Sequence, residues 1–246
     1  GSAEEVLKAL RAAGLFDVRE VTPDRMTQAV REAVQGGAKR VVAAGGDGTI
    51  SAVAAAVART DTELAIVPGG TLNHFAKDHG IPTDLAQACS VAAAGRVVPA
   101  DAAWVNGRLF LNTSSVGVYA HFVRLRERME PRLGYHLASL LALLRAFWGV
   151  RPFRLSFETD HFERPYLTPL VCVGLGEGEH KVPKVGGRED EGRRGLHVLI
   201  VRGRTRARLV ALAFAAAARG SHATSRTPHL DGFLVDHCII EQKHST

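Results

Sequence analysis

The segments VVAAGGDGTISAV (residues 41–53) and AIVPGGTLNHFAKDHGIP (residues 65–82) decide the fold of this chain. In each, an apolar run too short for a helix ends at paired glycines and leads into a helical pattern. The first run predicts a strand over 41–44 and a helix over 50–58, and the second predicts a strand over 65–67. Two such units in sequence predict neighbouring loops at the carboxyl edge of one parallel sheet, where open α/β sheets bind ligands.

The two glycine-rich loops predict a binding site for an anion. Glycine allows φ above zero and close approach of the backbone to a ligand. The N–H groups at the start of the following helix favour negative charge, and Thr49 and Thr71 add hydroxyl donors. A polyphosphate is therefore expected to lie across both loops. Asp47 would repel phosphate, so we expect it to cap the helix, to hold a metal or to act as a base.

These segments resemble the catalytic domain of the diacylglycerol kinase family, which includes soluble bacterial lipid kinases and the related sphingosine and ceramide kinases. The GGDGT motif at residues 45–49 also resembles NAD kinases and 6-phosphofructokinases, whereas the motif from Pro68 to Pro82 is much more specific. The resemblance continues through DAAWVNGRLFLN at residues 101–112 and weakens after about residue 185.

The resemblance implies ATP-dependent phosphorylation of a lipid hydroxyl, with diacylglycerol or a related lipid as acceptor and MgATP as donor. The implied nucleotide-binding residues are Thr22, Gly45, Gly46, Asp47, Gly48, Thr49, Ser51, Gly69, Gly70, Thr71 and Asn73. Ser51 stands where the family usually has asparagine, and Asn73 is expected to brace the second loop. The family also holds a structural magnesium in its second domain, to which Glu191 and the Leu196 carbonyl are the candidate ligands here.

The general base implied by the resemblance belongs to an Asp-Gly-Glu motif near the C-terminus. Here Asp231 and Gly232 are followed by Phe233, so we expect 232–242 to be the strand that precedes that motif. Asp47 is then the best remaining candidate for the catalytic base, or else it orients the metal.

The expected fold is a two-domain lipid-kinase architecture. Residues 1–97 are expected to form an α/β nucleotide-binding domain with a Rossmann-like parallel sheet that lacks its first strand. Residues 98–246 are expected to form a mainly antiparallel β-sandwich domain for the lipid, truncated at its C-terminal end. Further predicted helices cover 3–13, 27–35, 85–94 and 204–218, and further predicted strands cover 18–21, 108–113, 153–158 and 167–173.

Composition and the scattered cysteines favour a cytoplasmic enzyme, and the resemblance to lipid kinases implies peripheral contact with the inner face of a membrane. The 246 residues carry a formal charge of +6, but no basic run has interleaved aromatic residues, which argues against nucleic-acid binding. The three cysteines are far apart and are expected to be free thiols. No run of 18 apolar residues indicates a membrane span.

One segment, 132–148, has leucines at helical spacing. This pattern favours a helix that faces the core, and the alternative is a helix that lines an acyl-chain pocket or touches a bilayer.

Two other functions remain open at the level of the sequence. An NAD kinase would share GGDGT, but its Asn-Glu dinucleotide-binding motif is not found. A non-catalytic nucleotide-binding regulator is compatible with the two shortened ends. A dinucleotide-binding dehydrogenase is disfavoured because G-x-G-x-x-G follows neither strand. The sequence specifies neither the lipid nor the oligomeric state.

Overall fold

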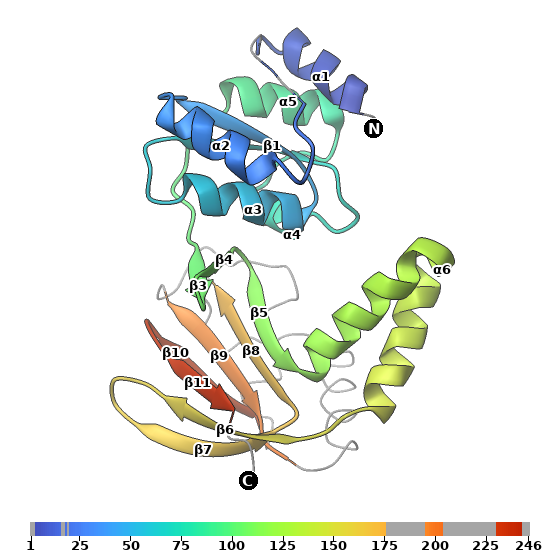
Figure 1. Cartoon of the computed structure of the whole chain (residues 1–246), viewed down its shortest axis with the longest axis vertical. Coiled ribbons are helices and arrows are strands. Elements are labelled where there is room, and N and C mark those ends of the chain that lie inside the picture. Colours follow the sequence, from blue (N-terminus) through green and yellow to red (C-terminus); the bar gives the residue numbers. More distant parts are fainter. Residues whose placement is uncertain (1–2, 16–17, 19, 176–194, 204–229, 243–246) are drawn as a thin grey trace. The chain divides into compact units, whose positions relative to one another are not determined.

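The computed structural model describes residues 3–15, 18, 20–175, 195–203 and 230–242, drawn in colour in Figure 1. The chain divides into two compact units, Gly1–Asn112 and Thr113–Thr246. Each unit is described by itself below.

The first unit is built on a two-stranded parallel sheet of β1 (Arg40–Gly45) and β2 (Glu63–Pro68). Its helices are α1 (Ala3–Ala12), α2 (Met26–Gln35), α3 (Asp47–Val57), α4 (His74–Asp78) and α5 (Leu85–Ala94). A short antiparallel pair, β3 (Ala103–Val105) and β4 (Arg108–Phe110), follows. The predicted parallel α/β arrangement of this part is thus confirmed.

Side chains of the two strands alternate between two apolar clusters, as the pleat of a strand requires. Ile66 packs in a cluster with residues of α2 and α3, whereas its neighbour Val67 packs in a cluster with residues of α1 and α5. Helices therefore cover both faces of the sheet. Arg40 ties the strands together through an ion pair with Glu63 at 2.6 Å, and it also donates to the last carbonyls of α5.

The strand predicted over 18–21 is wrong for its described residues, which are not in a strand. Val18 instead lies in a loop and packs, partly buried, against the apolar cluster of α1 and α5. Val18 contributes to the core without pairing, whereas Val21 is exposed. An apolar pattern alone does not distinguish such a loop from a strand.

The second unit contains two antiparallel sheets. One has the order β10 (Leu230–Val235), β9 (Leu196–Val201), β8 (Leu170–Leu175) and β5 (Thr113–Gly117). The other has the order β11 (Ile239–Gln242), β6 (Phe153–Glu158) and β7 (Glu163–Thr168). Both sheets contribute to one core, in which Leu155 and Phe157 of the smaller sheet pack with Val171, Val198 and Ile200 of the larger one.

Three predicted strands are each divided in two. The segment 108–113 contains β4 and the start of β5, and 167–173 contains the end of β7 and most of β8. The segment 232–242 contains most of β10 and all of β11. The break between β7 and β8 lies at Pro169. The Thr168 hydroxyl bridges it, because its oxygen accepts from the Leu170 N–H and its proton is donated to the Leu170 carbonyl. Apolar periodicity continues across such corners, which is why the sequence does not reveal them. The predicted helix over 204–218 lies outside the described residues.

Helix α6 (Val118–Trp148) is broken at Gly134, where φ is 71° and ψ is 166°. Figure 1 shows its two segments turning back on each other. The expectation that the leucines of 132–148 face the core is wrong, because they are exposed while Ala138, Ala142 and Ala146 are buried. No helix among the described residues is long and apolar enough to cross a membrane.

All three cysteines carry free thiols, as predicted. Burial raises the pKa of Cys172 to about 11, so this thiol stays protonated at neutral pH.

Candidate functional site

The two glycine-rich loops meet at the carboxyl ends of β1 and β2. The parallel register ends with Gly45 opposite Pro68, and the Gly69 N–H then donates to the Gly45 carbonyl at 2.9 Å. The two loops therefore leave the sheet side by side, and α3 and α4 begin just beyond them (Figure 1). This is the predicted meeting of two loops at one sheet edge.

The glycines of the loops are required by contact between the two backbones. A Cβ added to Gly70 would lie 2.6 Å from the Gly46 Cα, and a Cβ on Gly69 would lie 3.3 Å from the Gly45 Cα. None of these four glycines has a positive φ. What these glycines supply is therefore room for one loop to pack on the other, and not a left-handed backbone.

Asp47 joins the first loop to the helix of the second. One carboxylate oxygen accepts from the His74 N–H at 3.2 Å and the other accepts from the Phe75 N–H at 3.1 Å. Asp47 thus caps the start of α4 across the site, while the N-cap position of its own helix is taken by Gly46. Each oxygen retains a further lone pair for a metal or a proton.

Asn73 holds the second loop in shape. Its backbone is left-handed, with φ of 50° and ψ of 47°, and the residue is only 8% exposed. Its side-chain oxygen accepts from the Gly70 N–H at 2.8 Å, and its side-chain nitrogen donates to the Gly70 carbonyl at 2.7 Å. Both backbone polar groups of Gly70 are therefore satisfied by one side chain.

We expect Asn73→Ala to lower the free energy of unfolding by about 2 kcal/mol, because two hydrogen bonds are lost and alanine is strained in this conformation. Asn73→Gly removes the same hydrogen bonds but tolerates the left-handed backbone, so it should be less destabilising by about 1 kcal/mol. Urea unfolding of the two variants measures the difference. Equal stabilities would show that backbone strain at this position is unimportant.

The start of α3 is open on its outer side. The first hydrogen bond of the helix runs from the Ile50 N–H to the Gly46 carbonyl, so the N–H groups before it have no partner within the helix. Gly48 is exposed, and a Cβ placed there would meet no atom within 4 Å. An exposed helix N-terminus of this kind is suited to a phosphate group.

The remaining residues of the predicted nucleotide site lie around these two loops. The Thr49 side chain lies against Gly45, Thr71 is exposed in the second loop, and Ser51 is half-buried in α3. Thr22 lies in the exposed turn before α2, where its carbonyl accepts from the Arg25 N–H.

The predicted structural magnesium site is only partly within the described residues. Leu196 is the first residue of β9, and Glu191 lies outside the described part of the chain. Among the described residues, no group of three or more His, Cys, Asp or Glu side chains could hold a metal ion.

Sequence reasoning missed the partners of Asp47, which are the backbone N–H groups of His74 and Phe75. They lie 27 and 28 positions along the chain, so no local spacing rule could have identified them. The only signal in the sequence was that two loop motifs follow adjacent strands.

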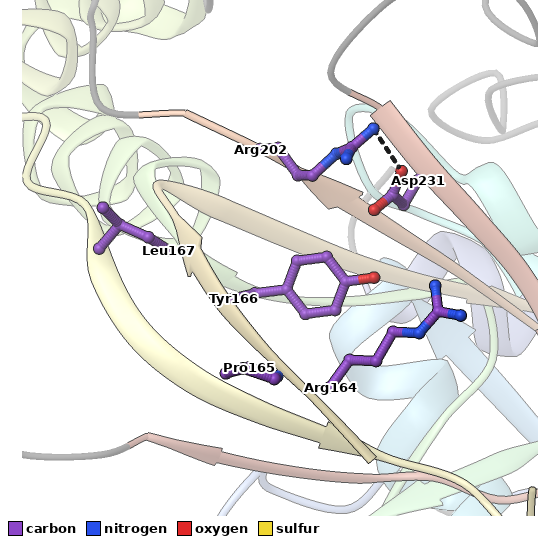
Figure 2. Close-up of a pocket in the computed structure, with 6 residues that line it drawn as sticks. All are labelled: Arg164, Pro165, Tyr166, Leu167, Arg202 and Asp231. Carbon is purple, nitrogen blue, oxygen red and sulfur yellow. Dashed lines mark ion pairs between the residues drawn. The ribbon is translucent and has the colours of Figure 1, made fainter. Parts of the chain in front are cut away.

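A second polar constellation lies in the second unit, in a cavity of about 340 Å³ shown in Figure 2. Arg202 and Asp231 form an ion pair at 3.1 Å, and the Tyr166 hydroxyl points toward Asp231. Burial, followed by the interaction with Asp231, raises the pKa of Tyr166. Asp231 of β10 is therefore engaged by Tyr166 of β7 and by Arg202, which follows β9, and this engagement argues against Asp231 as a general base.

Residues 2–105 match the family described as Diacylglycerol kinase catalytic domain. This part of the chain belongs to the diacylglycerol kinase catalytic domain family. The assignment includes both glycine-rich loops, and it confirms the resemblance stated from their motifs.

Curated relatives of this chain carry a common name. A "Probable lipid kinase YegS-like" protein of Cronobacter sakazakii is 40% identical over 155 residues, which is 61% of this chain and 51% of that protein. One from Enterobacter sp. strain 638 is 30% identical over 182 residues, which is 71% of this chain and 60% of that protein. The chain thus spans about half the length of many of the curated relatives it matches.

Solved structures of the family share the fold. A structure described as a diacylglycerol kinase from Bacillus anthracis str. Sterne aligns with a TM-score of 0.71 at 22% identity. The alignment covers 99% of this chain and 82% of that one. The mixed α/β part and the antiparallel sheets are therefore both features of the family's fold.

Proposed function

We propose that this chain is the catalytic part of an ATP-dependent lipid kinase, which transfers the γ-phosphoryl group to a lipid hydroxyl. The observation that carries the proposal is that two glycine-rich loops pack on each other next to the exposed N-terminus of α3. Membership of the diacylglycerol kinase family and the naming of relatives as lipid kinases support the same activity.

The nucleotide phosphates are proposed to bind at the N-terminus of α3, against the N–H groups around Gly48. Thr49 and Thr71 would add hydroxyl donors, and the backbones of both loops would position the phosphates for transfer. Preorganised N–H donors of this kind stabilise charge that develops on a transferred phosphoryl group. Thr22 and Ser51 are proposed as further nucleotide contacts.

Magnesium bound to the nucleotide would neutralise charge on the phosphates. Magnesium is usually held by one or two carboxylates together with substrate phosphates, so a single carboxylate at this loop fits it. Asp47 is that carboxylate, because each of its oxygens accepts only one backbone N–H. We propose that Asp47 positions the second loop through α4 and uses its remaining lone pairs toward the metal or, as a base, toward the lipid hydroxyl proton. Separately, we propose Glu191 and the Leu196 carbonyl as ligands of a structural magnesium ion.

Diacylglycerol or a related lipid is the proposed acceptor, and residues 98–246 are proposed to form the domain that receives it. The proposed place of action is the cytoplasmic face of a membrane, which the enzyme would contact peripherally. The choice of diacylglycerol rests on the family's name, since the curated relatives are named only as lipid kinases.

A transfer assay tests the proposal. The chain is incubated with Mg²⁺ and ATP labelled on the γ-phosphate, together with a mixed lipid extract or, separately, with NAD. Label that enters the organic phase supports a lipid kinase, and chromatography of that phase then identifies the lipid. Label on NAD would replace the proposal with an NAD kinase. ATP binding with no transfer to either acceptor would favour a nucleotide-binding regulator.

We expect Gly48→Ala to weaken ATP binding by about tenfold or more, because the new methyl group would stand where the phosphate approaches the backbone. The variant should be as stable as the parent chain or slightly more stable, since alanine is the better helix former and no atom obstructs it. Titration calorimetry with ATP and thermal unfolding measure the two effects.

Ala55→Gly provides the matched control, because Ala55 is exposed on the same helix. It should lower stability by about 1 kcal/mol and leave ATP affinity unchanged. If Gly48→Ala bound ATP as tightly as the parent chain, the phosphates would have to bind elsewhere.

A further inference from the structure

The second segment of α6 exposes an apolar stripe, here called the leucine face. It consists of Leu137, Leu140, Leu141, Leu144 and Trp148. These side chains are between 37% and 67% exposed, although leucine and tryptophan are usually well buried. Their spacing of three and four residues places them on one side of the helix.

The opposite side of the same segment is anchored to the protein. Ala138, Ala142 and Ala146, at a spacing of four residues, are at most 1% exposed. The first segment of α6 also reaches the second, because the Arg126 guanidinium lies 5.4 Å from the ring centre of Tyr135. The small residues therefore face the protein and the large apolar ones face outward, which reverses the usual pattern of a surface helix.

The sequence on either side of the leucine face is basic. Arg132, Arg145, Arg151 and Arg154 are all exposed, and the sequence contains no Asp or Glu between Glu130 and Glu158. An apolar stripe with an arginine border complements a surface that offers hydrocarbon together with negative charge. A second copy of this chain would instead bring a second set of arginines against the first.

The length of the segment fits a helix that lies in a membrane surface. From residue 135 to 148 it extends about 21 Å, which is shorter than the hydrocarbon core of a bilayer at about 30 Å. Trp148 ends the stripe, and tryptophan is enriched where a membrane meets water. The helix is suited to lying parallel to the surface with its leucines inserted.

We propose that the leucine face docks this protein on bilayers that contain anionic phospholipids. The docking deepens the proposed function, on which it rests, since it would bring the enzyme to the surface that contains its lipid acceptor. The occupant of the face is the bilayer itself, with leucines in the acyl region and arginines at the phosphates.

Sedimentation with vesicles tests the role of the leucines. We expect the chain to bind phosphatidylglycerol-containing vesicles and to bind them more weakly as salt is raised. The variant L140S/L144S should bind about tenfold or more weakly. V97S/V98S is the matched control, because these valines are 56% and 45% exposed in the other unit, and it should bind as the parent chain does. Equal binding by L140S/L144S and the control would overturn the proposal.

Fluorescence locates the contact on the helix. The chain has two tryptophans, so Trp104→Phe leaves Trp148 as the only reporter. Anionic vesicles should shift its emission to the blue, and R145Q/R151Q should reduce the shift more at low salt than at high salt. An unchanged spectrum in the presence of bound vesicles would place the contact elsewhere and overturn the proposal.

A short-chain diacylglycerol that dissolves as a monomer separates docking from catalysis. L140S/L144S should phosphorylate it at the parental rate while losing activity on the same lipid in vesicles. Loss of activity on the monomeric lipid too would make the leucines part of the substrate site and overturn docking. A change from dimer to monomer on sedimentation would assign the face to a second copy and also overturn it. Vesicle binding without transfer to any lipid would support docking while contradicting the kinase.

Discussion

Gly70→Ala is expected to abolish ATP binding and to lower the free energy of unfolding by about 2–3 kcal/mol. The new Cβ would lie 2.6 Å from the Gly46 Cα and 3.0 Å from the Asn73 side-chain oxygen. Neither neighbour can move freely, since one is backbone and the other is held by two hydrogen bonds to Gly70. The loops would have to separate, and the phosphate site formed by both would be lost.

The experiment compares Gly70→Ala with Gly48→Ala by urea unfolding and ATP titration. Both variants add one methyl group to a loop glycine, but only the first meets the opposite backbone. The expected pattern is a loss of stability for Gly70→Ala and none for Gly48→Ala, with weaker ATP binding in both. Parental stability of Gly70→Ala would contradict the close packing of the loops.

Asp47→Ala is expected to reduce phosphoryl transfer by about a thousandfold or more, if its carboxylate serves the metal or the proton as proposed. The same change should cost only about 1 kcal/mol of stability, which is the usual cost of losing a helix cap. Asp47→Asn keeps one carbonyl oxygen as acceptor but turns an NH₂ group toward the other backbone donor. It should therefore retain part of the stability and little of the activity.

Asp84 offers a matched control, because its carboxylate caps α5 by accepting from the Gln87 N–H at 3.0 Å. Asp84→Ala should lose a similar amount of stability and keep parental activity. Steady-state transfer rates and thermal unfolding of the Asp47 and Asp84 variants separate capping from chemistry. Full activity in Asp47→Asn would show that Asp47 serves the fold alone.

Local patterns in the sequence predicted the strands that lead into the glycine-rich loops, together with a neighbouring helix. The helix over 85–94 is found with the same limits, and the strands over 41–44 and 65–67 are found one to two residues longer at their ends. These elements are short apolar runs closed by glycine or capped by a polar residue, so their signals are local. The order strand, loop, helix, strand also predicted that β1 and β2 pair in parallel, and this pairing is found.

Features that depend on contacts distant in sequence were not predicted. The packing of the loop glycines on each other was not predicted, because a glycine needed for backbone packing looks the same in sequence as one needed for a positive φ. The orientation of the second segment of α6 was also misjudged. Leucine periodicity identifies a stripe but does not say whether the stripe or the alanines opposite it face the protein.

The hydrogen bonds that Asp47 accepts from α4, and those between Asn73 and Gly70, also affect how the site binds a ligand. Flexible phosphate-binding loops must lose conformational entropy when a nucleotide orders them, and that loss weakens binding. Here contacts within the protein fix the two loops to each other, so the ordering occurs during folding. The free energy of phosphate contacts is then available for affinity and for the transition state of transfer.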